Sequence, residues 1–124
     1  MSTTGPLFLG FDVGTQGVKA LVLDVGSDGG QSVVARSSEP LELIEGLPAG
    51  HLEQHPEHWL AAVRATCQRV LAEVDPGRIA AIGVSGQQHG CVVLDQHDAV
   101  IRPAKLWCDT ATADEARELS ERIG

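Results

Sequence analysis

Two apolar runs joined by a short glycine turn most restrict what this chain can fold into. The runs cover residues 7–11 and 18–25, and Asp12-Val13-Gly14-Thr15-Gln16-Gly17 lies between them. Predominantly apolar runs of this length, bounded by turn residues, are typical of strands. The sequence therefore predicts that the chain begins with two paired strands.

Later turn signals extend this hairpin into a sheet. Asp28-Gly29 predicts a second hairpin, because glycine adopts a positive φ without steric cost. The stretch 39–55 is rich in proline and glycine and is predicted to be a loop, with a short strand at 41–44 left open. Further strands are predicted at residues 32–37, 79–84, 91–94 and 100–101.

Two helices are predicted after these hairpins. Pro56 opens the first helix, which ends before Pro76. Its apolar stripe contains Trp59, Leu60, Val63, Cys67, Val70, Leu71 and Val74. The second helix follows Thr112, which is expected to form a capping box with Glu115. Hairpins first and helices later predict an α/β fold with a mixed sheet. Because the chain ends on a helix, we expect it to be part of a longer protein.

Composition excludes several classes of function. The 124 residues carry 17 acidic and 9 basic side chains, and a net charge of -8 repels nucleic acid and anionic lipid. No apolar run approaches the roughly 20 residues needed to cross a bilayer, and no signal peptide is recognisable. A cytoplasmic protein is expected. The three widely spaced cysteines argue against a disulfide framework. Cys67 and Cys91 are predicted to be buried, and Cys108 is left open.

The turn that begins at Asp12 could hold a phosphate. Its glycines present backbone N–H groups and Thr15 presents a hydroxyl, while the Asp12 carboxylate can hold a hydrated Mg²⁺. The segment is neither a Walker A loop nor a GxGxxG motif. An ordinary glycine hairpin remains the alternative, with Lys19 pointing to solvent.

Two later segments could bind a small polyol. Residues 85–90, Ser-Gly-Gln-Gln-His-Gly, place amides and an imidazole at a strand end, where they could bond hydroxyl groups. Trp107 could pack against a sugar ring with Asp109 beside it. The alternatives are a plain turn at 85–90, a core tryptophan, and an aspartate that favours a helix start.

Three histidines suggest a metal site as a further alternative. His51, His55 and His58 are spaced four and three residues apart. Pro56 interrupts the series, so a shared helical face is not expected.

Four segments taken together resemble the FGGY family of carbohydrate kinases. They are residues 10–19 (GFDVGTQGVK), 53–59 (EQHPEHW), 82–90 (IGVSGQQHG) and 102–109 (RPAKLWCD). The resemblance covers about residues 7–124 and implies an actin-like, ribonuclease H-like ATPase fold. It also implies that residues 1–124 form the N-terminal part of the first, sugar-binding domain. The rest of that domain, the ATP-binding C-terminal domain and the catalytic base are expected beyond residue 124.

The resemblance also implies roles for single residues. Asp12, Gly14, Thr15 and Gln16 match the turn that faces ATP and Mg²⁺, with Asp12 holding the ion through water. The sugar would contact Gln88, His89, Trp107 and Asp109. Lys19 matches a lysine of the family motif but receives no role. The partners implied are a sugar and ATP, without nucleic acid or membrane, and a homodimer is left open.

Within the family, the segment with His89 favours the members that phosphorylate D-xylulose to D-xylulose 5-phosphate. Many of these have Met where this chain has Gln88, which leaves the sugar open. Relatives also often have Asp where His55 stands, and His is a weaker N-cap. The alternatives are a kinase for gluconate, L-ribulose, L-fuculose, rhamnulose or glycerol, and a binding module without catalysis. The fragment alone is expected to be inactive.

Overall fold

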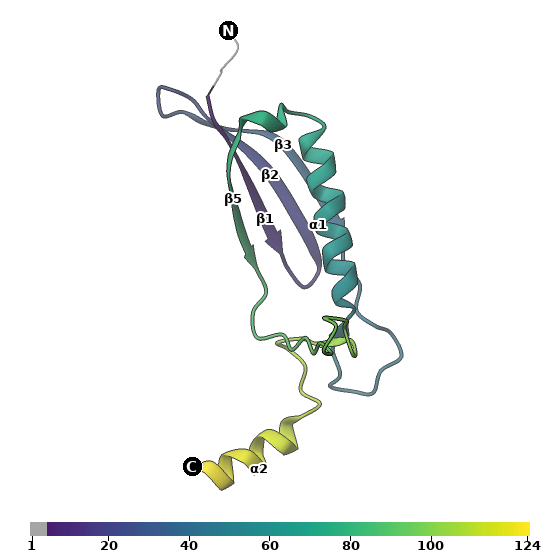
Figure 1. Cartoon of the computed structure of the whole chain (residues 1–124). Coiled ribbons are helices and arrows are strands. Elements are labelled where there is room, and N and C mark those ends of the chain that lie inside the picture. Colours follow the sequence, from purple (N-terminus) through teal and green to yellow (C-terminus); the bar gives the residue numbers. More distant parts are fainter. Residues whose placement is uncertain (1–4) are drawn as a thin grey trace. The chain divides into compact units, whose positions relative to one another are not determined.

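The computed structural model describes residues 5–124, which form two compact units (Figure 1). The first unit contains the chain up to Glu42 and then Glu57–Gln87. The second contains Leu43–Pro56 and Gln88–Gly124. The chain therefore crosses between the units three times, and one crossing falls between the two adjacent glutamines, Gln87 and Gln88.

A four-stranded mixed sheet forms the first unit. β1 (Leu7–Val13), β2 (Gly17–Val25) and β3 (Gln31–Pro40) are antiparallel neighbours, and β5 (Ile79–Gly86) runs parallel to β1. The order across the sheet is β3-β2-β1-β5. This arrangement confirms the two predicted hairpins and the mixed sheet.

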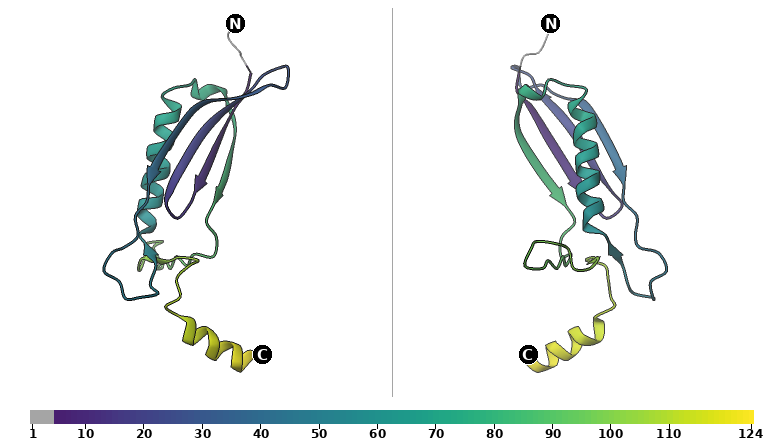
Figure 2. Two further views of the ribbon diagram at one scale, coloured as in Figure 1. Left: turned by 180° about the vertical axis from the view of Figure 1, so that it is seen from behind. Right: turned by 45° about the vertical axis from the view of Figure 1, so that its right-hand side comes forward.

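One helix, α1 (Pro56–Leu71), covers one face of this sheet (Figure 2). Alternate residues of each strand point toward it. The buried cluster beneath and on the helix comprises Leu7, Leu9, Ala20, Val22, Ala35 and Val70. A short 3-10 helix (Pro76–Arg78) then leads into β5.

The apolar stripe predicted for α1 includes Leu60, which is exposed in the structure. After Pro56, the buried positions of α1 are Ala62, Thr66 and Val70, whereas Leu60 is 60% exposed. Each residue turns a helix by 100°, so Leu60 lies about 200° around the axis from Ala62. Thr66 remains satisfied at its buried position, because its hydroxyl donates to the Ala62 carbonyl at 2.9 Å.

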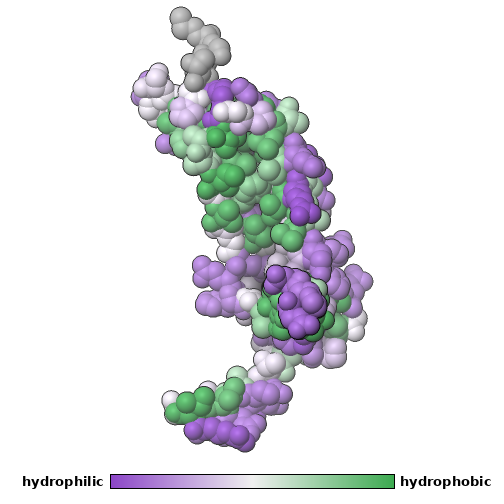
Figure 3. All heavy atoms as spheres, viewed as in Figure 1, coloured by the Kyte–Doolittle hydropathy of each residue, from purple (hydrophilic) through white to green (hydrophobic). Residues whose placement is uncertain are grey.

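The apolar strand β5 lies at an edge of the sheet and is less covered than its sequence predicts. Ile82 is 62% exposed and Val84 is 73% exposed. In the register with β1 they pair with Leu9 and Phe11, so they belong to the face that carries α1. Figure 3 shows apolar residues gathered on this face of the first unit, beside α1.

The second unit contains little regular structure. β4 (Glu53–Gln54) pairs with β6 (Ala104–Lys105), and isolated bridges join Cys91 to Lys105 and Leu94 to Val100. The predicted strands at 91–94 and 100–101 are therefore reduced to single bridges, and residues 41–44 form no strand. Cys91 is exposed, which corrects its predicted burial, because it lies outside the main sheet. Cys67 is half-buried against the core.

The last helix, α2 (Ala113–Ile123), begins where the sequence predicts, but without the predicted capping box. Thr112 occupies the N-cap position with φ -103° and ψ 23°, and its side chain makes no capping hydrogen bond. Caps of that kind need an extended backbone at this position. Leu119 and Ile123 are exposed on this helix. Within residues 5–124, no helix has the length and apolar character to cross a bilayer.

Two glycines of β5 provide a matched test of how closely β1 and β5 pack. A Cβ atom at Gly86 would lie 2.7 Å from the Val13 carbonyl oxygen, whereas one at Gly83 would meet nothing within 4 Å. We expect Gly86→Ala to destabilise the protein by roughly 1–3 kcal/mol through overpacking. Gly83→Ala should be neutral or stabilising, since alanine restricts the unfolded chain. Unfolding midpoints of the two variants measure the difference, and equal midpoints would contradict this packing.

Candidate functional site

The turn after β1 is closed by backbone hydrogen bonds and adjoins the end of β5. Gly14 N–H donates to the Gly17 carbonyl at 3.0 Å, which tightens the turn. Gln87 N–H donates to the Val13 carbonyl at 2.9 Å, and the Thr15 hydroxyl donates to Gln87 Oε1 at 2.9 Å. Parallel strands end at the same edge of a sheet, so two of the predicted motifs meet here.

A row of polar residues crosses the sheet next to this turn. Asp12 pairs with Lys19 on β2 and with Ser85 on β5, and Lys19 pairs with Ser38 on β3. Phe11 packs against the core, so the next residue, Asp12, points away from α1, as do its partners. The carboxylate of Asp12 and the ammonium of Lys19 therefore lie on the face of the sheet that α1 does not cover, the open face.

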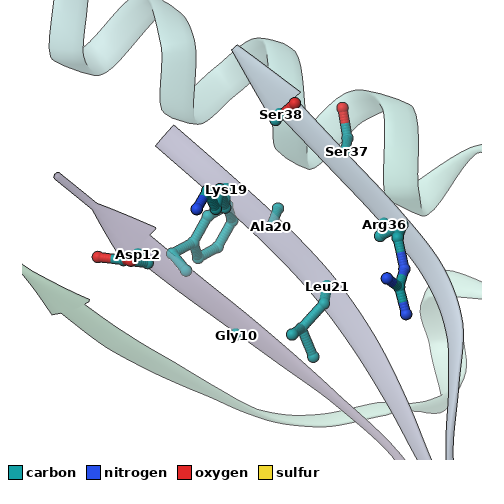
Figure 4. A pocket seen from close by; sticks show the side chains of 9 residues that line it. Gly10, Asp12, Lys19, Ala20, Leu21, Arg36, Ser37 and Ser38 are labelled. Carbon is teal, nitrogen blue, oxygen red and sulfur yellow. The ribbon is translucent and has the colours of Figure 1, made fainter. Parts of the chain in front are cut away.

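This open face is hollowed in front of the polar row (Figure 4). The hollow has a volume of about 780 Å³. Gly10 and Leu21 form its floor, and Asp12, Lys19, Arg36 and Ser38 supply the polar groups around it. The absence of a side chain at Gly10 keeps the floor low beside Leu21.

Asp12 fits the role of a magnesium-binding carboxylate. Its side chain is exposed at the end of β1, beside a turn that carries backbone N–H groups and the Thr15 hydroxyl. Protein sites for Mg²⁺ commonly supply one or two carboxylates, while water and substrate phosphates complete the octahedron. Among the described residues, no three His, Cys, Asp or Glu side chains are grouped as a metal site. His51, His55 and His58 therefore form no such group.

His89 adopts an unusual backbone conformation in the second unit. Its φ is 61°, in the left-handed region that few residues other than glycine adopt. Two residues after His89, the Cys91 N–H donates to the Lys105 carbonyl at 2.9 Å, which ties this segment to β6. Gln88, His89 and Gly90 are all exposed. Strained backbone is often found at ligand-binding positions, where the surroundings hold it in place.

Trp107 is 60% exposed, so it is not the core tryptophan considered as an alternative. It lies in a turn after β6, in which Asp109 N–H donates to the Leu106 carbonyl at 3.0 Å. An exposed aromatic ring can offer apolar surface to a ligand.

The Asp109 carboxylate, in contrast, is occupied by groups of the chain itself. Its Oδ2 accepts from Leu52 N–H at 2.8 Å and from Lys105 Nζ at 3.4 Å, and its Oδ1 accepts from Ala111 N–H at 2.9 Å. The side chain is 3% exposed. Asp109 therefore ties the Trp107 turn to the segment that precedes α1.

The same contacts set the ionisation of Asp109. Burial acts to raise the pKa of its carboxyl group, but the hydrogen bonds from Leu52, Ala111 and Lys105 and the charge of Lys105 outweigh burial. The pKa is lowered below its ordinary value as a result. The charged carboxylate is thus the form that the fold favours.

Asp109 is expected to contribute to acid unfolding. A lowered pKa stabilises the folded state at pH values above the unfolded-state pKa of about 3.9, and this stabilisation is lost as the pH falls through the folded-state pKa. We expect Asp109→Asn to be less stable at neutral pH and to show a shallower loss of stability below about pH 4. Unfolding midpoints between pH 7 and pH 3 test this. The exposed Asp114, replaced by Asn, controls for the loss of one carboxylate, and parallel curves for wild type and Asp109→Asn would contradict the expectation.

The sequence drew attention to most of this arrangement but missed two participants. Gln87 lies in the polar segment 85–90, but its bond to Thr15 becomes evident only from the pairing of β1 with β5. Nothing in the residue type of Lys105 predicts a role in the site. Its spacing of four residues from Asp109, with which it pairs, is the feature of the sequence that could have indicated one. Of the predicted site residues, the first unit brings Asp12, Gly14, Thr15 and Gln16 together, and the second unit contains Gln88, His89, Trp107 and Asp109.

Comparison with known proteins identifies consistent relatives. Residues 7–124 match the FGGY family of carbohydrate kinases, N-terminal domain. The xylulose kinase of Haemophilus influenzae is 40% identical over 124 residues, which cover 95% of this chain and 24% of the relative. The chain thus spans about a quarter of the length of the curated relatives it matches.

Solved structures give the same result at the level of the fold. A xylulose kinase from Rhodospirillum rubrum superposes with a TM-score of 0.83 and 28% identity over 94% of this chain and 23% of its own. A gluconate kinase from Lactobacillus acidophilus superposes with a TM-score of 0.82 and 27% identity, with the same coverage. The predicted actin-like ATPase fold is confirmed, and this chain corresponds to its N-terminal part.

Proposed function

Because the chain belongs to the FGGY family of carbohydrate kinases, we propose that the whole protein transfers the γ-phosphate of ATP to a sugar. We further propose that the sugar is D-xylulose and the product D-xylulose 5-phosphate. The observation that carries the proposal is the turn after β1, which presents Asp12 beside Gly14, Thr15 and Gln16 next to the end of β5.

The first unit would serve the phosphate end of ATP. Backbone N–H groups of Thr15 and Gln16 would donate to phosphate oxygens, while the Gly14 N–H closes the turn on the Gly17 carbonyl. The bond from Thr15 to Gln87 holds the turn in place. Asp12 would hold Mg²⁺ through water. When bound there, the ion neutralises charge that develops on the transferring phosphoryl group.

The second unit would serve the sugar. Gln88 and His89 supply amide and imidazole groups for hydroxyl recognition, and the exposed Trp107 supplies a flat apolar face. Asp109, which has its carboxylate occupied by Leu52, Ala111 and Lys105, would contribute by holding the Trp107 turn in position.

The reaction would be an in-line displacement at phosphorus. The terminal hydroxyl oxygen of the sugar forms a bond to the γ-phosphorus as the bond to the bridging oxygen of ADP breaks. The hydroxyl proton passes to a base that we place outside residues 1–124, together with the adenosine-binding domain. Residues 1–124 would then supply positioning for both substrates, which accounts for much of the rate enhancement in such reactions.

The choice of D-xylulose rests on similarity to xylulose kinases and on the segment that contains His89. The gluconate kinase match supports a second candidate, a kinase for another sugar or polyol of the family. Gln88 is the residue that bears most on this choice, because many D-xylulose kinases of the family have Met at this position. An amide bonds a hydroxyl group more strongly than the thioether of Met does.

An assay of ADP release decides between these candidates. The whole protein is supplied with Mg-ATP and a panel of pentuloses, polyols and aldonates. We expect turnover that is selective for D-xylulose. Turnover with another member of the panel would keep the kinase and change the substrate. Folded protein that turns over none of them would favour a binding module without catalysis.

A further inference from the structure

The second unit contains a cluster of charged side chains together with the proposed sugar-binding residues. The Lys105 ammonium is 3.8 Å from Glu53 Oε1 and 3.4 Å from Asp109 Oδ2. Arg102 also pairs with Glu53 Oε1. Glu53 is 6% exposed and Asp109 is 3% exposed at their side chains, while Lys105 is 23% exposed. One half-buried ammonium is therefore shared by two buried carboxylates.

The backbone of Lys105 joins the same residue to a third segment. Its carbonyl accepts the Cys91 N–H at 2.9 Å, two residues after His89. Lys105 also pairs with Glu53 in the register of β4 and β6, and Leu106 N–H donates to the Leu52 carbonyl at 3.0 Å. Lys105 thus contacts the segment before α1, the segment that follows His89, and the turn that carries Trp107.

This charge arrangement does more than neutralise buried carboxylates. Glu53 already has Arg102 as a partner, and Asp109 already accepts two backbone N–H groups. Buried ion pairs gain little net stability, because desolvation offsets their attraction. Their best-attested use is to specify one arrangement among several. Within residues 5–124, the Lys105 ammonium is the charged group that pairs with both carboxylates.

We propose that Lys105 is a positioning residue for sugar binding. Its ammonium, held between Glu53 and Asp109, and its carbonyl, bound by Cys91 N–H, fix His89 and Trp107 relative to each other within the second unit. This inference rests on the proposed function of His89 and Trp107. It assigns Lys105 no contact with the sugar or with ATP.

The test compares Michaelis constants for the two substrates in the whole protein. Lys105→Met keeps an unbranched side chain of similar length and the backbone bond from Cys91 but removes the charge. We expect it to raise the KM for the sugar about tenfold, the range of a lost charged hydrogen bond. The KM for ATP should stay within about twofold. Lys105→Arg, which restores a cation, should recover most of the sugar affinity.

Arg117→Met provides the matched control, because Arg117 pairs with Asp114 on the exposed surface of α2. It should change neither Michaelis constant. Glu53→Gln offers a second route if Lys105→Met does not fold, since it weakens the opposite side of the cluster and retains the shape of the side chain. It should also raise the KM for the sugar selectively.

Three results would overturn the inference. They are an unchanged sugar KM in Lys105→Met, a parallel rise of the sugar and ATP constants, and no recovery in Lys105→Arg. Failure of the proposed function is distinguishable, because wild-type protein would then phosphorylate no sugar. An active wild type with an unaffected Lys105→Met variant would leave the function standing and remove the role of Lys105.

Discussion

Asp12→Asn is expected to lower the kcat of the whole protein by about 100- to 1,000-fold, the range found when one electrostatic stabiliser of a transition state is removed. The amide keeps the shape of the side chain but cannot hold a hydrated Mg²⁺ as a carboxylate does. The KM for the sugar should change little, since the proposed sugar-binding residues belong to the other unit. Initial rates with saturating ATP and sugar measure the effect.

Asp28→Asn is the matched control for Asp12→Asn. Asp28 lies in the turn between β2 and β3, where its Oδ1 accepts from Gly30 N–H at 2.9 Å, a bond that an asparagine oxygen can also accept. Its kcat should equal that of wild type. If Asp12→Asn also retained the wild-type kcat, the assignment of Asp12 to the magnesium and phosphate site would be wrong.

His89→Asn is expected to raise the KM for the sugar by about 10- to 100-fold, which corresponds to the loss of one or two well-placed hydrogen bonds. The KM for ATP should change much less. Asparagine is the informative replacement, because it tolerates the left-handed φ of 61° better than other residues except glycine. Alanine at this position would add backbone strain of order 1 kcal/mol and confuse stability with recognition.

Asp98→Asn controls for the backbone conformation in this experiment. Asp98 has the same φ of 61° but lies in the tight turn whose backbone N–H groups bond to Asp95. The variant should leave both Michaelis constants at wild-type values. An unaltered sugar KM in His89→Asn would remove His89 from the proposed sugar site, whatever the result for Asp98→Asn.

The sequence predicted the parts of the fold that depend on local patterns. The hairpins at Gly14 and Gly29 and the helix that opens at Pro56 carry residues whose backbone preferences are strong. The strand predicted at 79–84 is present and extends to Gly86. Edges and short pairings were harder to predict, because residues 91–94 have the composition of a strand but only isolated bridging partners. The exposed position of Leu60 depends on which helical face meets the sheet, and several rotations share similar apolar spacing.

The candidate site was predictable by residue but not by contact. Asp12, Thr15, His89 and Trp107 belong to motifs whose chemistry can be read from their residue types. The bond from Thr15 to Gln87 spans 72 positions of the chain. It follows from the parallel pairing of β1 with β5, which no local pattern specifies. The occupied carboxylate of Asp109 likewise depends on donors that lie as far away as Leu52.

The exposure of Trp107 makes it an optical reporter. The chain contains two tryptophans, and the other, Trp59, is half-buried in α1. An exposed indole emits at longer wavelength and is open to collision with a water-soluble quencher such as acrylamide, whereas a covered indole is protected. A sugar ring stacked on Trp107 would shift its emission to the blue and shield it from the quencher. Occupancy of this surface could then be followed by fluorescence in a Trp59→Phe background, without ATP and without turnover.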